Sequence, residues 1–304
     1  MPAAPTPLKG ARAILGGTVR GVWRTLVGAG LLWLALVGEA AAVPRWLTLP
    51  PTPTLPKAVV SGYAPVDGID IWYAEFGRGS PVLLLHGGLA NADYWGNQVR
   101  ALEGRYRVIV MDSRGHGRST RDGTPFSYAL MAQDVLGLMN YLHIRKAAVV
   151  GWSDGAIIGL ELAIHHPDRV SKLFAFAANS DPGGTKDVSK SPVFTRYLAR
   201  TRREYAHLSP TPHDYDAFLE QVTRMWATQP HFTAAELHGI KVPTWIVDAD
   251  HDEAIKRSDT LFMADHIPGS GLLILPQVSH FAFLQDPGLF DAALRDFLAN
   301  VKGH

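Results

Sequence analysis

The sequence predicts an α/β fold: a doubly wound, mostly parallel sheet with helices on both faces and a helical insertion. Short apolar runs alternate with segments of helical spacing from residue 69 onward. Runs that are apolar throughout suit strands buried on both faces of a parallel sheet, and strand–helix alternation is typical of such sheets. The alternation breaks once, between about residues 181 and 240, where two helical patterns follow each other. That break predicts an insertion between two strands.

Each expected element has its own signal. Residues 69–76 alternate apolar and polar side chains after a turn at Asp67 and Gly68, which is the pattern of a half-buried strand. The later strands are expected as apolar runs at residues 81–86, 106–112, 146–151, 170–177, 242–248 and 271–275. Helices are expected at residues 92–102, 128–142, 156–165 and 289–301.

The composition is that of a globular protein. The chain has 304 residues, of which 47% are hydrophobic, enough for one large core or two small domains. The 29 basic and 28 acidic residues nearly cancel, which excludes the strongly basic field that nucleic-acid binding needs. The sequence contains no cysteine, which excludes disulfides, thiolate nucleophiles and zinc–sulfur sites. No other group of side chains has the spacing of a metal site.

The first 42 residues have the pattern of a targeting segment. Residues 1–38 hold four basic side chains and no acidic one, residues 26–37 are apolar, and three alanines end at Ala42. This arrangement predicts a signal peptide cleaved after Ala42, and therefore an exported protein, periplasmic or secreted. An uncleaved membrane anchor and a mitochondrial presequence are the alternatives.

The rest of the chain is expected to divide into a linker, a core and a cap. Residues 43–57 hold five prolines, which predicts an extended linker that spaces the domain from the membrane or the export site. The core is expected at residues 58–180 and 241–304, interrupted by a helical cap at residues 181–240. A helical insertion at the carboxyl edge of such a sheet lies over the crevice where ligands bind.

The strongest catalytic signal is Ser153, which stands between Gly151 and Gly155, directly after an apolar strand and before a helix. A tight turn of this kind strains the backbone of the serine and exposes its hydroxyl above the sheet. The glycines are needed because side chains at their positions would clash. The amino end of the following helix directs its partial positive charge toward the hydroxyl. The pattern predicts a catalytic nucleophile rather than a helix cap.

A serine hydroxyl needs a general base, and the base needs a carboxylate that fixes its tautomer. His280 follows the last expected strand, where a loop could fold back over the edge of the sheet. Asp252 lies in the loop beyond the preceding strand, with room to reach that histidine. We therefore predict Ser153, Asp252 and His280 as catalytic residues, with Asp250 and Asp181 as alternatives for the carboxylate.

A tetrahedral intermediate needs two hydrogen-bond donors for its oxyanion, and the loss of one costs about 10²–10³ in rate. The backbone N–H of Asp154, at the amino end of the helix, is expected to be the first donor. The turn at residues 87–89 follows an apolar strand and is expected to supply the second donor from Gly88, with Leu89 as the alternative. A turn with a purely structural role is the other interpretation of this segment.

From about residue 61 to its end, the chain resembles the α/β-hydrolase superfamily, in particular the serine-nucleophile branch with an HG-x oxyanion loop and a small helical cap. The matching segments are residues 86–88, 112–119 and 151–155, together with Asp252 and His280. The resemblance implies an eight-stranded sheet, no cofactor and an acyl-enzyme mechanism. It also implies that Asp112 and the residues after it shape a loop and take no part in the chemistry.

These residues predict a serine hydrolase that cleaves a carboxylic ester of a small, apolar or aromatic substrate through an acyl-enzyme. The candidate substrate-binding residues are Trp152, which precedes Ser153 in the sequence, and Trp95 and Phe281, which are expected near the mouth of the active site. The same machinery suits a lactone or the cleavage of a carbon–carbon bond. An aminopeptidase would need an acidic group to hold the substrate amine, and the sequence alone places none.

The alternative from another class is a non-catalytic ligand-binding protein on the same fold, against which a complete triad argues. A small molecule is the expected partner in both cases. We expect no nucleic acid, because Arg200, Arg202 and Arg203 have the spacing of a solvated helix face. Contact with a membrane is expected only through an uncleaved N-terminal segment.

Overall fold

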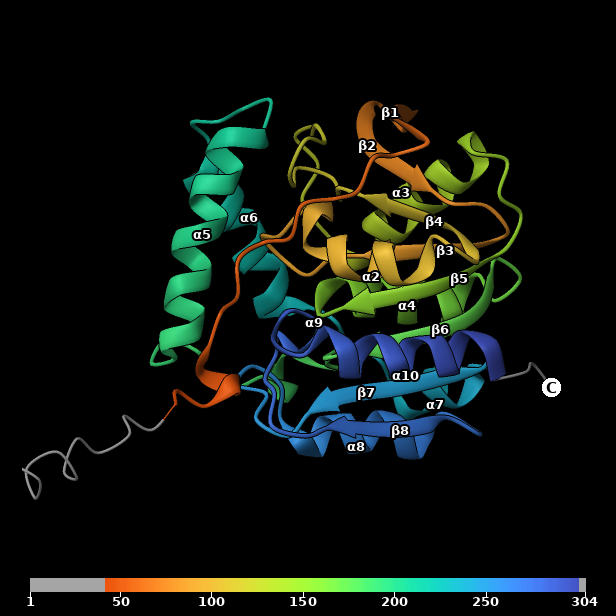
Figure 1. Cartoon of the computed structure of the whole chain (residues 1–304), viewed down its shortest axis with the longest axis vertical. Coiled ribbons are helices and arrows are strands. Elements are labelled where there is room, and N and C mark those ends of the chain that lie inside the picture. The colour runs from red at the N-terminus through yellow and green to blue at the C-terminus, as the bar shows by residue number, and fades with distance from the viewer. Residues whose placement is uncertain (1–41, 301–304) are drawn as a thin grey trace, which may run out of the picture. The chain divides into compact units, whose positions relative to one another are not determined.

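The computed structural model describes residues 42–300, which fold around an eight-stranded sheet (Figure 1). The strands are β1 (Val60–Val66), β2 (Ile69–Phe76), β3 (Ser80–Leu85), β4 (Tyr106–Met111), β5 (Ala147–Trp152), β6 (Val170–Phe176), β7 (Thr244–Ala249) and β8 (Gly271–Leu275). Their order across the sheet is β1-β2-β4-β3-β5-β6-β7-β8. Strand β2 pairs antiparallel with β1 and with β4, and all other neighbours are parallel. The predicted fold class is confirmed.

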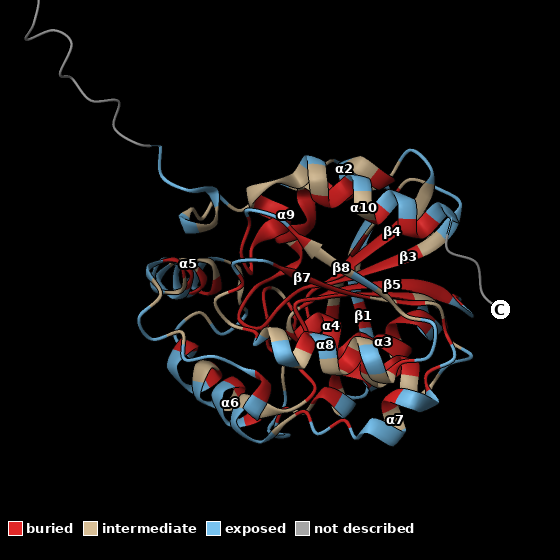
Figure 2. Ribbon diagram, turned by 90° about the horizontal axis from the view of Figure 1, so that it is seen from below, coloured by how far each residue is buried: buried red, intermediate tan, exposed pale blue. Residues whose placement is uncertain are grey.

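Helices cover both faces of the sheet (Figure 2). On one face lie α2 (Gly96–Leu102), α9 (Ala282–Gln285) and α10 (Pro287–Asn300), and on the other lie α3 (Tyr128–Tyr141), α4 (Asp154–His165), α7 (Ala234–Gly239) and α8 (Arg257–His266). Each face has its own apolar core: Val82 and Leu84 of β3 enter one, and Leu83 and Leu85 enter the other. Successive strand residues point to opposite faces, so a strand that serves two cores is apolar throughout.

The chain divides into two units, Met1–Val43 and Pro44–His304, and the elements described here belong to the second. The expected signal peptide or anchor at residues 1–42 falls almost wholly outside the described residues. Within residues 42–300, we find no helix with both the length and the apolar character needed to span a bilayer. Short 3-10 helices occur at η1 (Arg45–Leu47), η2 (Ala92–Trp95) and η3 (Pro182–Gly184).

Two elements carry too weak a pattern to be predicted. Strand β1 pairs along the edge of the sheet, where Val60 and Tyr63 are exposed while Ala64 and Val66 are buried. Helix α8 buries only two side chains, so it lacks an apolar stripe at helical spacing. Strand β1 forms because it pairs with β2, and α8 forms because it packs against the sheet. The residues of these elements do not by themselves indicate such partners.

Residues 44–58 contain the short 3-10 helix η1 and are otherwise extended, as their prolines predict, but they lie against the domain and do not form a linker that stands apart from it. We call this segment the strap, because it runs along the surface of the domain beside α2 and the cap (orange in Figure 1). Leu49 and Leu55 pack against the core, and Arg100 of α2 donates to the carbonyl oxygen of Thr54 at 2.7 Å. A Cβ on Gly96 would lie 2.7 Å from the same oxygen. An extended proline-rich segment leaves its carbonyls without internal partners, so neighbouring side chains bind them.

The insertion between β6 and β7 contains α5 (Pro192–Leu208), α6 (Tyr215–Thr228) and α7. Helix α5 begins at Pro192 because the Ser191 hydroxyl accepts the N–H of Phe194 and caps the first turn. Helices α5 and α6 stand together at the side of the sheet, and we call them the cap (Figure 1). Helix α7 packs against α4 and α8, so the end of the insertion belongs to the core.

Candidate active site

Ser153 lies on the tight turn from β5 to α4, at the carboxyl edge of the sheet. Its φ of 54° and ψ of −120° are unusual for any residue other than glycine. A Cβ on Gly151 would overlap the backbone of Gly155 and Ala156, and a Cβ on Gly155 would lie 2.5 Å from the carbonyl carbon of Leu85. Helix α4 therefore packs directly against β3 and β5, and this close packing holds the serine at the turn.

Asp252 and His280 come together from two loops. They follow β7 and β8, neighbouring parallel strands that end at the same edge of the sheet. His280 Nδ1 lies 2.8 Å from Asp252 Oδ2, and the two residues are only 3% and 4% exposed. The other carboxylate oxygen accepts the N–H groups of Ala254 and Ile255 at 2.7 and 2.8 Å. The carboxylate is thus oriented by its own loop to accept a hydrogen bond from the Nδ1–H of His280, which leaves Nε2 free to act as a base.

The pKa values of this pair shift because each group stabilises the charge of the other. Burial acts against the charged form of both groups, but their mutual attraction and hydrogen bond outweigh it. The pKa of Asp252 is lowered by the charge and hydrogen bond of His280 and by the N–H groups of its loop. The pKa of His280 is raised by Asp252, with smaller effects from Glu253 and Asp248. Asp252 therefore stays ionised, and His280 is a stronger base than a free imidazole.

Ser153 and His280 line one cavity of about 170 Å³. Phe194 of α5 and Trp226 of α6 line it too, so the cap closes over the serine. The remaining lining residues are Tyr128, Asp154, Asn179, Thr185, Lys186, Val188, Gln229, Ala254 and Ile255. None of the hydrogen bonds formed by residues 42–300 joins the Ser153 hydroxyl to His280, so proton transfer requires the two side chains to come within hydrogen-bond distance of each other.

The turn after β3 lies against Ser153. A Cβ on Gly87 would lie 3.1 Å from the Cβ of Ser153, and a Cβ on Gly88 would lie 2.5 Å from Asp154 Oδ2. Leu89 has a φ of 65°, which bends the chain away sharply after the two glycines. The N–H of Asp154 is one of those at the start of α4 that lack an intrahelical acceptor. The candidate oxyanion donors thus lie on two segments that meet at Ser153.

The side chain of Asp154 also lines the cavity, although the sequence suggests a role only for its N–H. Trp226 Nε1 donates to both carboxylate oxygens at 2.9 Å, and the Tyr128 hydroxyl donates to Oδ1 at 3.0 Å. Burial raises the pKa of Asp154 to about 6, against the effect of these two donors. Both hydrogen-bond donors are neutral, and the charge that lowers this pKa is that of His280. Because a pKa of about 6 lies below neutral pH, the cavity holds an anionic group beside Ser153.

Known proteins with similar sequences share this fold. The family model described as alpha/beta hydrolase fold matches residues 80–213. The putative carbamate hydrolase RutD of Caulobacter sp. (strain K31) is 30% identical over 245 residues, 71% of this chain and 90% of that protein. The chain belongs to the α/β-hydrolase family. It is therefore a hydrolase of the α/β fold, and the family resemblance is confirmed.

Two further relatives cover more of the chain or supply a solved structure. Serine hydrolase BPHL of Homo sapiens is 28% identical over 300 residues, 94% of this chain and 99% of that protein. The solved structure of Est816, described as an N-acyl homoserine lactone degrading enzyme, has a TM-score of 0.64 at 25% identity and covers 78% of this chain and 100% of its own.

The three aromatic residues expected to bind substrate lie in the core of this α/β-hydrolase instead. Trp95, Trp152 and Phe281 are each at most 1% exposed, and none of them lines the cavity. Trp152 is the last residue of β5, and strand alternation turns its ring into the core on the α2 and α10 side. Proximity to the nucleophile in sequence is therefore misleading here. Phe194 and Trp226 of the cap supply the aromatic walls of the cavity.

The alternative carboxylates have other partners. Asp250 accepts the backbone N–H of Val278 at 3.3 Å, and Asp181 lies 2.7 Å from Nδ1 of His231. Asp252 is thus the aspartate bonded to His280. Among residues 42–300, no group of three His, Asp or Glu side chains lies close enough to hold a metal ion.

Glu253 is a site residue that the sequence analysis missed. Its carboxylate accepts the backbone N–H of His280 at 3.1 Å and the hydroxyl of Ser279 at 3.3 Å. Glu253 therefore holds the histidine loop from the neighbouring aspartate loop. Its position next to Asp252 in a short acidic run was the one signal that could have indicated this role.

Asp112 and His86 support the scaffold around the site. Asp112 accepts the backbone N–H groups of Ala92 and Arg118, both at 2.7 Å, and so joins the loops after β3 and β4. His86 Nε2 accepts the N–H of Ser113 at 3.0 Å. Burial lowers the pKa of His86, so the ring stays neutral and Nε2 can accept this hydrogen bond. Neither residue lines the catalytic cavity.

Proposed function

We propose that this protein is a serine hydrolase that cleaves a small carboxylic ester through an acyl-enzyme. The observation that carries the proposal is the 2.8 Å contact between His280 Nδ1 and Asp252 Oδ2 beside a cavity that Ser153 also lines. A buried charged pair is costly to form, and perturbed ionisable groups in a cavity are typical of catalytic sites. The strained turn at Ser153 is a second feature of this kind.

The reaction has two half-reactions. In the first, the Ser153 oxygen attacks the ester carbonyl carbon while His280 Nε2 accepts the hydroxyl proton. The tetrahedral intermediate then expels the alcohol, which takes that proton from His280 and leaves the acyl group on the serine. In the second, water attacks the acyl carbon, His280 again accepts and returns one proton, and the carboxylic acid leaves. Asp252 remains ionised throughout and stabilises the imidazolium.

The developing oxyanion requires two backbone donors. The N–H of Asp154 is the first, since it lies at the positive end of α4 directly after the nucleophile. The second comes from the turn after β3, from Gly88 or from Leu89. Both lie on the segment that packs against Ser153 and Asp154.

The cavity supports a small substrate with an apolar part. Its volume of about 170 Å³ lies below the range of drug-sized ligand sites, which begins at about 300 Å³. Val188, Phe194 and Ile255 form apolar walls. We therefore expect the rate of hydrolysis of nitrophenyl esters to fall once the acyl chain exceeds a few carbons.

Asp154 favours esters that carry a positive charge near the scissile bond. Its carboxylate lines the cavity, is held by two neutral donors, and is ionised at neutral pH. We expect benzyl alaninate to exceed benzyl propionate in kcat/KM by at least about tenfold, equivalent to about 1.4 kcal/mol. Asp154→Asn keeps the backbone donor and should abolish the preference. Equal rates for the two esters would reject an amine-binding role for Asp154.

A lactone is the second candidate substrate class. Est816, a structural relative that covers 78% of this chain, is described as degrading N-acyl homoserine lactone. A lactone carbonyl can be attacked by the same serine, and its alcohol then stays attached to the acyl group. Cleavage of an activated carbon–carbon bond is a further use of the same triad. Parallel assays with small esters, lactones and a diketone distinguish the three by their products.

A fluorophosphonate probe tests whether the protein is a serine enzyme at all. We expect the probe to label the wild-type protein and not the Ser153→Ala variant. A folded wild-type protein that is not labelled would instead support a non-catalytic ligand-binding protein on the hydrolase fold.

We also propose that the protein is exported by its N-terminal segment. The basic start, the apolar run and the three alanines support this proposal. Cell fractionation and N-terminal sequencing test it, with Val43 expected as the first residue of the mature chain. A full-length chain in the cytosolic fraction would reject export.

A further inference from the structure

Helix α5 presents one stripe of polar side chains to the strap. Arg196, Arg200 and Glu204 are spaced four residues apart, so they lie in one row along the helix. Arg196 Nη2 donates to the carbonyl oxygen of Leu47 at 2.6 Å, and Arg200 Nη2 donates to that of Leu49 at 2.9 Å. These two contacts join successive turns of α5 to the strap.

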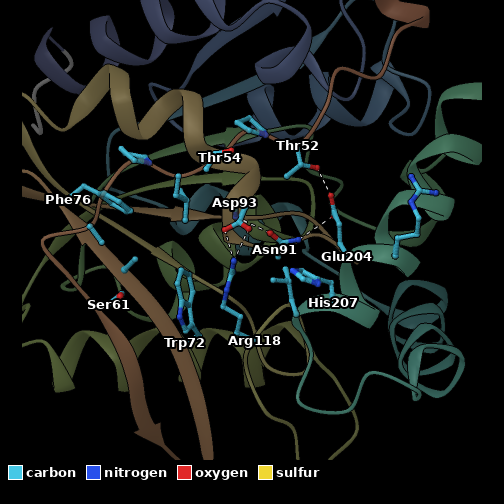
Figure 3. A pocket seen from close by; sticks show the side chains of 17 residues that line it. Thr52, Thr54, Ser61, Trp72, Phe76, Asn91, Asp93, Arg118, Glu204 and His207 are labelled. Carbon is cyan, nitrogen blue, oxygen red and sulfur yellow. Dashed lines mark hydrogen bonds and ion pairs between the residues drawn. The ribbon is translucent and has the colours of Figure 1, made fainter.

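Glu204 joins the strap to Asn91, two residues beyond the turn after β3. Its carboxylate accepts the hydroxyl of Thr52 and the side-chain N–H of Asn91, the latter at 3.3 Å. Figure 3 shows Glu204 between these two residues. A cavity of about 550 Å³ lies here, lined by the strap, β2 and α5. Across this space, polar contacts connect the strap and α5 with Asn91.

Tyr197 of α5 reaches the same turn from inside the domain. Its hydroxyl donates to the carbonyl oxygen of Gly88 at 2.6 Å. The residue is buried, with its ring against Tyr94, Trp152 and Phe281. Burial raises the pKa of Tyr197 well above that of a free phenol, so the hydroxyl keeps its proton and can donate. A buried phenol needs a polar partner, and here the partner is the carbonyl beside the candidate oxyanion donors.

The orientation of the Gly88 carbonyl affects the Leu89 N–H and the Gly88 N–H, which are the two candidates for the second oxyanion donor. The C=O of Gly88 and the N–H of Leu89 share one planar peptide unit and point in opposite directions. Leu89 has a φ of 65°, a conformation that costs roughly 1–3 kcal/mol and persists only where its surroundings hold it. The N–H of Gly88 is bonded to the same Gly88 α-carbon that carries this carbonyl group. A donor on the Gly88 oxygen therefore fixes the Leu89 N–H and restricts the Gly88 N–H.

We infer that Tyr197 and Glu204 are positioning residues for the oxyanion donors, and that the strap holds α5 where these two side chains reach the turn. The inference rests on the proposed acyl-enzyme function, because only a reaction that develops an oxyanion depends on these donors. Neither residue lines the catalytic cavity, so their effect on the reaction passes through residues 88–91. The N-terminal strap is thereby part of the catalytic apparatus.

Tyr197→Phe tests the contact with the turn, because it keeps the ring and removes only the hydroxyl. The loss of an oxyanion donor lowers kcat about 10²–10³-fold, and we expect a misdirected donor to lower it about 10- to 100-fold with KM within about threefold. Tyr205→Phe is the matched control. Tyr205 is buried on the same helix, and its hydroxyl lies 3.0 Å from Thr211 Oγ1, away from the turn. We expect the control to keep kcat within about twofold of wild type.

The kcat and KM values distinguish positioning from a general packing effect. Equal kcat for Tyr197→Phe and the wild type would overturn the inference, and so would equal losses in Tyr197→Phe and Tyr205→Phe. A rise in KM that accounts for the whole change in kcat/KM would also overturn it. A trifluoromethyl ketone, which forms a tetrahedral adduct with the serine, gives an independent readout. Its affinity should fall by about the same factor as kcat.

Thr52→Val tests the strap, because it keeps the shape of the side chain and removes the donor to Glu204. We expect kcat to fall about 3- to 10-fold in the wild-type background. In the Tyr197→Phe background, the same change should have little further effect, since both substitutions act through one turn. Independent, multiplying losses would overturn the role of the strap.

The wild-type protein separates this inference from the proposed function. If the fluorophosphonate probe does not label wild-type Ser153, the proposed function fails and the inference fails with it. If the probe does label wild-type Ser153, the proposed function stands, and the labelling rates of the wild type and of Tyr197→Phe then test only the positioning inference. Equal labelling rates would reject that inference.

Discussion

Gly155 tests how the nucleophile is held in place. A Cβ at this position would lie 2.5 Å from the carbonyl carbon of Leu85 and 2.7 Å from the carbonyl oxygen of His86. Both are backbone atoms of the segment around the end of β3, so neither can move by a simple rotation of a side chain. Ordinary contacts begin near 3.4 Å, so Gly155→Ala requires α4 to move away from β3 by about 1 Å.

The size of the effect follows from that displacement. Overpacking typically costs about 1–3 kcal/mol, and the better helix propensity of alanine offsets about 1 kcal/mol of it. We therefore expect the free energy of unfolding to fall by about 2 kcal/mol, near the upper end of the net range, because the clash is with backbone atoms. Each 1 kcal/mol lowers Tm by about 2–4 °C in a domain of this size, so Tm should fall by about 4–8 °C. The same shift displaces Ser153 and the Asp154 N–H, and a misplacement of 1 Å can cost about 10²-fold in rate.

The assay compares Gly155→Ala with Gly159→Ala on the same helix. A Cβ on Gly159 would meet the end of the Leu173 side chain at 2.6 Å, which can rotate away, and Val149 Cγ1 at an ordinary contact distance of 3.4 Å. Thermal unfolding followed by circular dichroism gives Tm, and hydrolysis of p-nitrophenyl acetate gives kcat. Gly159→Ala should stay within about 3 °C of the wild type. If the Gly155→Ala variant kept the Tm and kcat of the wild type, the direct packing of α4 on β3 would be refuted.

The candidate triad leads to three further expectations. Ser153→Ala should lower kcat by several orders of magnitude with Tm nearly unchanged, and a loss below about tenfold would place the nucleophile elsewhere. Asp252→Asn should lower kcat about 10⁴-fold, because the amide supports the wrong tautomer of His280; a matching fall in Tm would indicate a structural role instead. In a pH profile, kcat/KM should rise as His280 loses its proton. Because the pKa of His280 is raised, the midpoint should lie above about 6.5, and a flat profile from about pH 5 to 9 would reject His280 as the base.

The sheet could be predicted where the strands have buried neighbours on both sides. Strands β3 and β5 send alternate residues into two cores, so their buried residues form continuous apolar runs that are distinctive in the sequence. Strand β1 has no such apolar run, because it is an edge strand with Val60 and Tyr63 exposed. Helix α8 buries too few side chains to show a period. These elements depend on neighbours distant in sequence, which no local pattern describes.

The candidate catalytic residues follow a similar division. The turn around Ser153 is local, and Gly151 and Gly155 indicate it directly because larger residues cannot fit there. Asp252 and His280 could be placed on loops after adjacent strands, and parallel strands end at one edge. The 2.8 Å contact between them depends on the register of β7 against β8, which only the folded sheet establishes.

The amino-acid sequence by itself determined the fold class, the turn that exposes Ser153 and the loops that hold its candidate partners, because each depends on short-range periodicity or on a steric demand for glycine. Tertiary structure alone decided which aromatic rings face the cavity, what the strap contacts and where the Asp154 carboxylate lies. A tryptophan in sequence indicates burial but not which of two faces it is buried on, and prolines impose an extended backbone without indicating what binds its carbonyls. Those outcomes depend on contacts such as Arg196 with Leu47, between residues about 150 positions apart, which form only when the whole domain is assembled.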